Sequence, residues 1–290
     1  MERNTANYKL RFFLLMAFFG CMGPVVRAIN LSSVAIACLR AWISSLFLII
    51  YLLFTRKTFP GKELKAVLKP MILCGLFMAG DWIGLFESYR YTSIATATVC
   101  YYLAPVFVFI VSPVFFGEKF TVKHILCILM AFLGMALVSG IVESGIPSFS
   151  EIKGILFALL GAVCYAGITI TNKKVDFDDT ILRTTLQLVT TAVIMTPYAL
   201  LSGNGISVEA LSLKDVLLLL LLGIGFTALP YIKYMDYIRR IPAQTISLFS
   251  YADPLVAVLI SVFLLSEPIS IYGIIGSVLI ILSAIVSERD

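Results

Sequence analysis

The chain has 290 residues, of which 60% are apolar and only 13% are charged, whereas soluble domains carry about 25% charged residues. This composition indicates an integral membrane protein and leaves no room for a water-soluble domain. The formal net charge of +5 is spread over many short polar segments, so it does not indicate a nucleic-acid-binding protein.

Ten apolar runs follow one another along the chain, each about as long as a bilayer-spanning helix. The predicted helices cover residues 12–28, 33–54, 70–89, 94–116, 122–142, 154–171, 181–201, 214–235, 242–265 and 270–286. The first run follows Arg3, Lys9 and Arg11 and resembles the start of a signal peptide. The small-x-small triplet at residues 35–37 lies too late for cleavage, so we expect a retained first helix. The fold class expected is an all-α integral membrane protein with ten transmembrane helices.

The distribution of basic residues predicts how these helices are oriented. If successive connections alternate between the two sides, 17 of the 22 Lys and Arg residues fall on the side of the N-terminus. Cytoplasmic connections carry the excess of basic residues, so we expect both termini in the cytoplasm. The expected location is the cell membrane, in a multi-pass arrangement.

The second half of the sequence repeats features of the first half. At an offset of 149 residues, Tyr102 aligns with Tyr251 and Pro105 aligns with Pro254. Such self-similarity over half the chain indicates an internal repeat.

The repeat predicts how the chain is divided. At an offset of 143 residues, Arg40 aligns with Arg183. We expect residues 1–145 to form the first five-helix repeat and residues 146–290 the second. Because five is odd, the second repeat enters the membrane from the opposite side, so the repeats are inverted. Inverted repeats are typical of secondary transporters that bind solute near the midplane between the repeats.

Two pairs of segments resemble a known family. They are Tyr102–Val108 with Gly117–Lys119, and Tyr251–Val256 with Ser266–Pro268. In these segments and over nearly its whole length, the chain resembles the drug/metabolite transporter superfamily, in particular the EamA-type ten-helix transporters. The resemblance implies export of amino acids or related compounds.

Two acidic residues lie deep in apolar runs, Asp81 in the third and Asp253 in the ninth. A carboxylate at bilayer depth is costly and normally faces a partner or a cavity, so both are candidates for binding solute and for coupling transport to protons. The alternative is a structural ion pair with Arg27 or Arg40. Arg40 could instead hold a substrate carboxylate through its planar guanidinium group.

Aromatic residues at similar depth complete the candidate substrate-binding set. These are Trp82, Tyr101, Tyr102, Tyr165 and Tyr251. A midplane tyrosine needs a polar neighbour or a wet cavity, and rings near a carboxylate bind organic cations through their faces. The alternative for each tyrosine is core packing with its hydroxyl bonded to a neighbouring helix.

Prolines and paired charges suggest local features of the helices. Prolines inside the runs predict bends; they are Pro24, Pro105, Pro197, Pro230 and Pro254. Two acid–arginine pairs with a spacing of three residues predict local ion pairs, Glu87 with Arg90 and Asp236 with Arg239. Glu118 and Glu267 end their runs and are expected to be structural or gating residues.

The sequence therefore predicts a secondary transporter for an amino acid or a related amine-bearing compound, working by alternating access, with export favoured. The alternative is proton-coupled uptake of an organic cation. A remote alternative is an intramembrane aspartyl protease, although the residues around Asp81 and Asp253 do not match its motifs. No enzymatic activity, cofactor or metal is expected, because the single histidine, His124, supports no cluster. The expected partners are a small-molecule substrate and the lipid bilayer.

Overall fold

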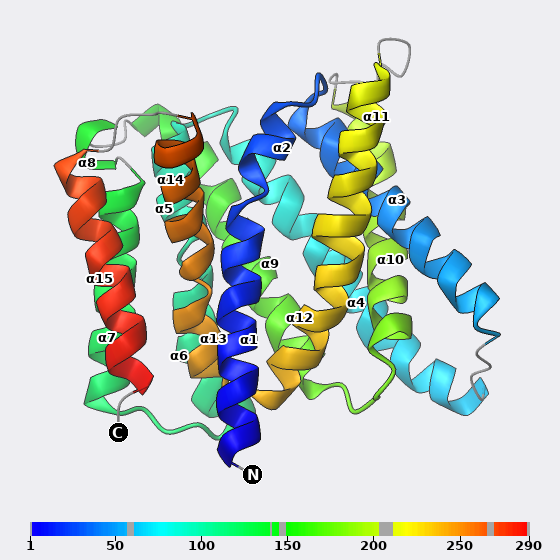
Figure 1. Ribbon diagram of the computed structural model, residues 1–290, viewed down its shortest axis with the longest axis horizontal. Coiled ribbons are helices and arrows are strands. Elements are labelled where there is room, and N and C mark those ends of the chain that lie inside the picture. The colour runs from blue at the N-terminus through cyan, green and yellow to red at the C-terminus, as the bar shows by residue number, and fades with distance from the viewer. Residues whose placement is uncertain are drawn as a thin grey trace. The chain divides into compact units, whose positions relative to one another are not determined.

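The ordered elements of the chain are helices. The computed structural model describes residues 2–56, 61–139, 141–144, 149–202, 211–265 and 270–288, and no strand occurs in those ranges (Figure 1). The elements are α1 (Glu2–Gly20), α2 (Gly23–Arg27), α3 (Ser33–Phe54), α4 (Gly61–Ser88), α5 (Ile94–Tyr101), α6 (Ala104–Phe116), α7 (Val122–Val138), α8 (Ile141–Ser144), η1 (Phe149–Glu151), α9 (Ile152–Lys174), α10 (Thr180–Leu201), α11 (Leu213–Leu220), the π-helical η3 (Leu221–Ala228), α12 (Leu229–Arg240), α13 (Ala243–Phe249), α14 (Ala252–Leu265) and α15 (Ile271–Glu288).

The number of apolar helices agrees with the ten predicted runs. Within the described residues, eight helical stretches are long and apolar enough to cross a bilayer, and two shorter apolar helices cover Val122–Val138 and Ile271–Ser287. Large apolar side chains on these helices point outward, for example Phe54 at 84% exposure and Val114 at 83%. In water such surfaces would be strongly unfavourable, whereas lipid solvates them, so the molecule is a multi-pass membrane protein.

Polar caps explain where several helices begin. The side chains of Ser32, Ser93, Thr121, Asp179 and Ser212 each accept a backbone N–H from the first turn of the following helix. Such caps satisfy donors that have no partner within the helix. The five helices start within one residue of the predicted runs.

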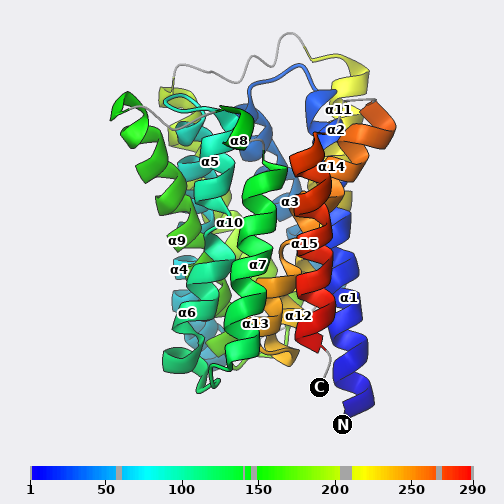
Figure 2. The ribbon, with the colours of Figure 1, turned by 90° about the vertical axis from the view of Figure 1, so that its left-hand side faces the viewer.

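The chain forms two compact units. Unit 1 contains residues 1–21, 84–166 and 240–290. Within it, α7 and α15 lie side by side (Figures 1 and 2), and a Cβ atom on Gly134 would lie 2.7 Å from the carbonyl oxygen of Gly276. This close approach is typical of helices that pack in lipid through small residues. The start of α1 and the end of α15 lie at the same end of unit 1 (Figure 2).

Unit 2 contains residues 22–83 and 167–239. Within it, α3 packs against α10 and against the π-helical segment η3, where Ser44 donates a hydrogen bond to the carbonyl of Gly223 at 2.7 Å. Helix α4 approaches α10 at Gly75, whose carbonyl accepts the hydroxyl of Thr191 at 3.2 Å. Polar bonds of this kind link helices inside an apolar surround.

Each unit combines segments from both halves of the sequence. The division into repeats at residues 145 and 146 stays a prediction, and that boundary lies outside the described residues. So does the Ser266–Pro268 segment of the family resemblance.

Candidate functional site

Two helical spans of unit 1 are broken at matching points. The first break separates α5 from α6 at Tyr102 and Leu103, and the second separates α13 from α14 at Ser250 and Tyr251. Adding 149 to the starts of α5 and α6, at 94 and 104, gives 243 and 253, within one residue of the starts of α13 and α14. The offset that relates the two sequence segments therefore also relates the two breaks.

A proline follows each break and accounts for it. Pro105 and Pro254 have no backbone N–H, so the carbonyl four residues earlier loses its helical partner. The chain tightens instead: Leu103 N–H bonds to the carbonyl of Cys100 and Asp253 N–H to that of Ser250, each at 3.3 Å. The predicted bends at these two prolines are thus breaks in the helical hydrogen-bond pattern.

The residues at the two breaks contact one another. The hydroxyl of Tyr251 donates to the carbonyl oxygen of Tyr102 at 2.9 Å, and the hydroxyl of Tyr102 donates to Oδ2 of Asp253 at 3.4 Å. The two rings lie with centroids 6.3 Å apart. Tyr251 is fully buried, whereas Tyr102 and Asp253 remain partly exposed. Three predicted site residues are therefore brought together, and we call Tyr102, Tyr251 and Asp253 the break cluster.

Two further predicted tyrosines lie beside the break cluster. The ring of Tyr101 stands edge-on to that of Tyr102, with centroids 5.5 Å apart. The hydroxyls of Tyr165 and Ser250 lie 3.2 Å apart, and because Ser250 donates to the carbonyl of Ile246 at 2.7 Å, Tyr165 is the donor. The cluster thus combines a carboxylate with aromatic rings, as predicted for this part of the chain.

The chemistry available at the break cluster is that of a single carboxylate. Among the described residues of unit 1, no Lys or Arg lies within salt-bridge distance of Asp253, and its hydrogen bond comes from Tyr102. A carboxylate in such surroundings binds a cation or a proton. The neighbouring rings favour an organic cation.

The other predicted residues meet in unit 2. The guanidinium carbon of Arg40 lies 3.9 Å from the ring centre of Trp82, and Nη1 of Arg40 lies 3.3 Å from the sulfur of Met22. Asp81, next to Trp82 on α4, is only 5% exposed, like Trp82 itself. Arg40 is therefore held by stacking on an aromatic face, which is a favourable place for a guanidinium group.

One buried polar network was not predicted from the sequence. Arg183, on the first turns of α10, is 0% exposed and donates through Nη2 to the backbone oxygen of Asn172 at 2.6 Å and to its Oδ1 at 3.2 Å. Asn172 in turn bonds Gln187 and Cys74, both at 3.3 Å. The sequence analysis counted Arg183 among the basic residues of a connection. Its alignment with Arg40 and the polar residues of run 181–201 were the signals that could have placed it inside.

Comparison with known proteins assigns the chain to a family. The sequence model of the EamA-like transporter family matches residues 9–140 and residues 152–288. The chain belongs to the EamA-like transporter family. It is therefore a membrane transporter, in agreement with the resemblance noted from the two aligned segments.

Relatives of this EamA-like transporter carry the same general description. An uncharacterized transporter YxxF of Bacillus subtilis (strain 168) is 28% identical over 281 residues, which cover 96% of this chain and 88% of that protein. An uncharacterized transporter of Archaeoglobus fulgidus is also 28% identical, over 89% of this chain and 90% of its own length. A protein of known crystal structure is similar in fold, with a TM-score of 0.81 at 20% identity, covering 99% of this chain and 96% of that one.

Glu118 has a structural role in this EamA-like transporter. Its two carboxylate oxygens accept the backbone N–H groups of Ala243 at 2.7 Å and Gln244 at 3.0 Å. These are the first residues of α13, so the carboxylate caps that helix from the end of α6. The structural alternative predicted for Glu118 is borne out, whereas Glu267 lies outside the described residues.

The two acid–arginine pairs differ in the contacts that they make. Glu87 and Arg90 form the predicted local ion pair at 2.9 Å. Arg239 extends to the connection before α10, where it bonds the carbonyl of Phe177 at 2.9 Å and the carboxylate of Asp178 at 3.3 Å. Arg239 thus ties the end of α12 to that connection.

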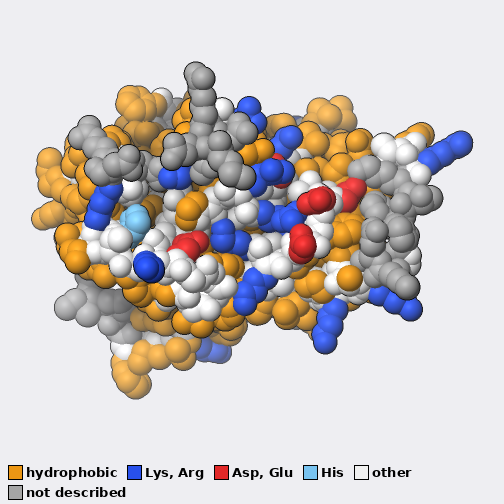
Figure 3. Space-filling model, turned by 90° about the horizontal axis from the view of Figure 1, so that it is seen from below, with side chains coloured by type: hydrophobic (Ala, Val, Ile, Leu, Met, Phe, Trp, Pro, Cys, Tyr) orange, Lys and Arg blue, Asp and Glu red, His pale blue; other side chains and the backbone are white. Residues whose placement is uncertain are grey.

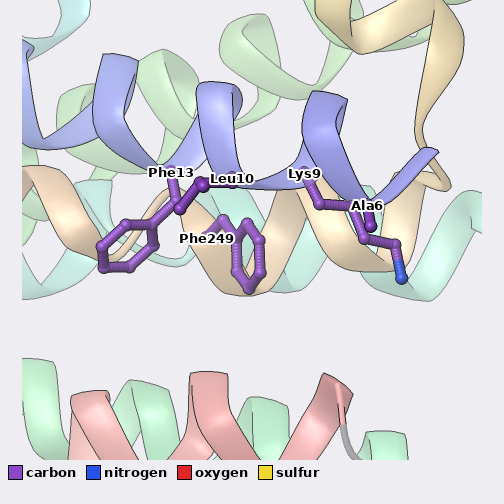
Figure 4. A pocket seen from close by; sticks show the side chains of 5 residues that line it. All are labelled: Ala6, Lys9, Leu10, Phe13 and Phe249. Carbon is purple, nitrogen blue, oxygen red and sulfur yellow. The ribbon is translucent and has the colours of Figure 1, made fainter. Parts of the chain in front are cut away.

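The outer surface of the EamA-like transporter has an open groove of about 230 Å³ in unit 1. Ala6, Lys9, Leu10, Phe13 and Phe249 line it (Figure 4). Its lining is apolar except for Lys9, so it lacks the carboxylate and hydroxyl groups of the break cluster. Among the described residues, no group of three His, Cys, Asp or Glu side chains is placed to hold a metal ion.

Proposed function

We propose that this protein is a secondary transporter that exports a small amine-bearing solute, such as an amino acid, by alternating access. Asp253 binds the amine of the solute. The observation that carries the proposal is the contact of the Asp253 carboxylate with the Tyr102 hydroxyl, at 3.4 Å, where two broken helices meet.

The binding chemistry follows from the surroundings of that carboxylate. An ammonium group entering the membrane loses water and needs a negative partner, which Asp253 supplies. The rings of Tyr102 and Tyr101, whose centroids lie 5.5 Å apart, offer further attraction for the cation. Tyr251 holds the backbone of Tyr102 in place through its hydroxyl.

The same carboxylate provides a means of coupling. It neutralises either one ammonium group or one proton, but not both. When no solute is bound, the charge on Asp253 makes the return conformational change unfavourable inside the membrane. The return of the empty transporter therefore requires a proton on Asp253. The solute then leaves the cell in exchange for a proton that enters, and the two bind the same carboxylate in turn. Asp81 also lies deep in an apolar run and is buried next to Trp82. It is the second candidate for a coupling residue.

The breaks provide the flexibility that alternating access requires. Missing helical bonds at Pro105 and Pro254 lower the resistance of the α5–α6 and α13–α14 spans to bending. Bending at residues 102–103 and 250–251 moves the segments that carry Tyr102 and Asp253. The rearrangement therefore changes the surroundings of the carboxylate that binds the solute.

Proton-coupled uptake of an organic cation is a second candidate function. A carboxylate and aromatic rings are sufficient to bind an organic cation that has no carboxylate of its own. The absence of a Lys or Arg partner for Asp253 among the described residues of unit 1 favours this candidate as much as it favours an amino acid.

Transport by purified protein in vesicles tests the proposal. Vesicles with an imposed pH gradient are given either a mixture of labelled amino acids or labelled choline, with uptake followed in both orientations. We expect gradient-driven accumulation of amino acids, and Asp253→Asn is expected to abolish it. Asp176→Asn is the matched control, because that carboxylate is fully exposed. Full concentrative transport by Asp253→Asn would refute the role of Asp253, and accumulation of choline alone would favour the second candidate.

A further inference from the structure

Arg183 is the largest side chain that is fully buried in the described part of the chain. It lies one turn into α10, after the cap at Asp179. The apolar residues Val67, Met71 and Leu182 pack into a core cluster around Cys74 next to it. A guanidinium group is always charged, so Arg183 places a cation where bulk solvent does not reach it.

Most of the hydrogen-bonding capacity of Arg183 is unused. A guanidinium group has five N–H donors, two of them on Nη2. Nη2 bonds the two oxygens of Asn172. The other three donors, on Nε and Nη1, have no hydrogen-bond acceptor among the described residues. No carboxylate in that part of the chain lies within salt-bridge distance either.

The surrounding network holds the guanidinium group but does not neutralise it. Asn172 is fixed by its own bonds to the carbonyl of Ile168 at 3.0 Å and to Oε1 of Gln187 at 3.3 Å. These are neutral groups. Asp178 belongs to the same end of unit 2 but is exposed to solvent and bonds Arg239 at 3.3 Å.

The equivalent residue in the other half of the sequence differs. Arg40, which aligns with Arg183 at an offset of 143, stacks on the ring of Trp82 at 3.9 Å. No ring is recorded over Arg183 among the described residues. Asp178 and Asp236 act on the charge of Arg183 without bonding it. A buried cation without a bonded counter-charge is costly, and such a group is a candidate functional residue.

We propose that Arg183 binds the carboxylate group of a small solute within unit 2 through Nε and Nη1, with Asn172 and Gln187 positioning the guanidinium group. This assignment rests on the proposed function. In this structure α4, α9 and α10 cover Arg183, so a solute needs the movements of transport to reach it. A solute reaches it when α4 separates from α10, as alternating access allows. The ligand class is then a small carboxylate-bearing solute, which an amino acid satisfies and choline does not.

The first experiment uses acetate as the smallest carboxylate probe. Thermal unfolding of the purified full-length protein is measured in acetate, in chloride and in phosphate at equal ionic strength, and with neutral acetamide. A ligand that binds only the folded state raises its Tm. We expect acetate to raise the Tm of the wild type above the value in the other solutions, and Arg183→Gln to lose that increase. Arg183→Lys, which keeps the charge but not the planar donors, is expected to lose most of it.

Arg239→Gln is the matched control, since that arginine already bonds Phe177 and Asp178. It should keep the acetate effect. An equal acetate effect in the wild type and in Arg183→Gln, or none in the wild type, would overturn the assignment. An equal increase in chloride or phosphate would identify an inorganic anion site and would also overturn it.

A transport measurement separates this inference from the proposed function. In vesicles, Arg183→Gln is expected to reduce exchange of the amino-acid mixture at least tenfold. If the wild type carries choline but not amino acids, and acetate does not stabilise it, the carboxylate assignment fails while an amine transporter at Asp253 stands. If neither solute is transported but acetate still stabilises through Arg183, the proposed function fails and the anion site stands.

Discussion

At the scale of single residues, Tyr251 links the two broken spans of unit 1. Its hydroxyl bonds the carbonyl of Tyr102, and its side chain is fully buried. A carbonyl at a helix break in the membrane depends on donors within the protein, because lipid supplies none. The residue therefore contributes to the fold and also orients Tyr102 toward Asp253.

Removing this hydroxyl is expected to reduce stability. Tyr251→Phe leaves the ring in place but takes away the bond to Tyr102, at a cost of about 1 kcal/mol. The measurement is the Tm of the purified protein in detergent. Tyr272→Phe serves as the control, because Tyr272 is 42% exposed on α15. An unchanged Tm for Tyr251→Phe would contradict a stabilising bond at the break.

Replacing Arg183 by an apolar residue of similar length is expected to have the opposite effect. Arg183→Met removes a buried cation whose Nε and Nη1 have no hydrogen-bond partner among the described residues, so the free energy of unfolding should rise by about 1 kcal/mol or more. Denaturation without added carboxylates provides the measurement. A fall in stability would mean that the bonds to Asn172 outweigh the cost of burying the charge. Arg239→Met, which breaks existing bonds, should not stabilise the protein.

The sequence singled out some residues of the candidate site but not Arg183, for a physical reason. Depth in an apolar run is visible in sequence, and it singled out Tyr102, Tyr251 and Asp253, which the structure brings into contact; their role in binding solute stays a prediction. The unused donors of Arg183 depend on which groups surround it in three dimensions. Hydropathy alone could not show them, because Arg183 stands near the start of its run, where a basic residue is ordinary.

At the scale of whole helices, the apolar runs predicted the spans but not their interruptions. A run of apolar residues has the same hydropathy whether its backbone is continuous or broken. Pro105 and Pro254 do break their spans, whereas Pro197 lies inside the unbroken α10. Pro230 follows the π-helical segment η3, in which the hydroxyl of Thr227 bonds the carbonyl of Leu222.

Helix α1 packs against the first turn of α14, which contains Asp253. A Cβ atom added to Gly20 would overlap the carbonyl oxygen of Asp253 and lie 2.9 Å from Cβ of Val256. Gly20→Ala should therefore push α14 away, lower the stability by about 1–3 kcal/mol and impair transport. The Tm and the vesicle assay measure both effects. Gly23→Ala is the control, because a Cβ there meets nothing within 4 Å, and equal behaviour of the two variants would contradict the packing argument.

At the scale of the whole molecule, each compact unit is built from both halves of the sequence. A chain of this kind cannot complete either unit until its second half is made, since unit 2 joins residues 22–83 to residues 167–239. The inverted repeats predicted at residues 1–145 and 146–290 would provide the matching segments. The shared offset of the two helix breaks supports this origin.

Orientation in the membrane is the remaining prediction. The start of α1 and the end of α15 lie at one end of unit 1, and the view from that side in Figure 3 shows Lys and Arg side chains together with Asp and Glu side chains. The excess of basic residues on the connections of that side predicts that it faces the cytoplasm. Lys65 and Lys214 are both exposed and fall on opposite sides in this topology.

Cysteine labelling in cells tests that orientation. In a variant whose six free cysteines are replaced, Lys65→Cys is expected to react with an impermeant maleimide only after the membrane is opened. Lys214→Cys should react in intact cells. The two sites control for each other, because both are exposed lysines and differ in the side predicted. Labelling of Lys65→Cys in intact cells, with Lys214→Cys protected, would show that the topology is the reverse of the one predicted. The direction in which a proton entering through Asp253 drives the solute would then be reversed as well.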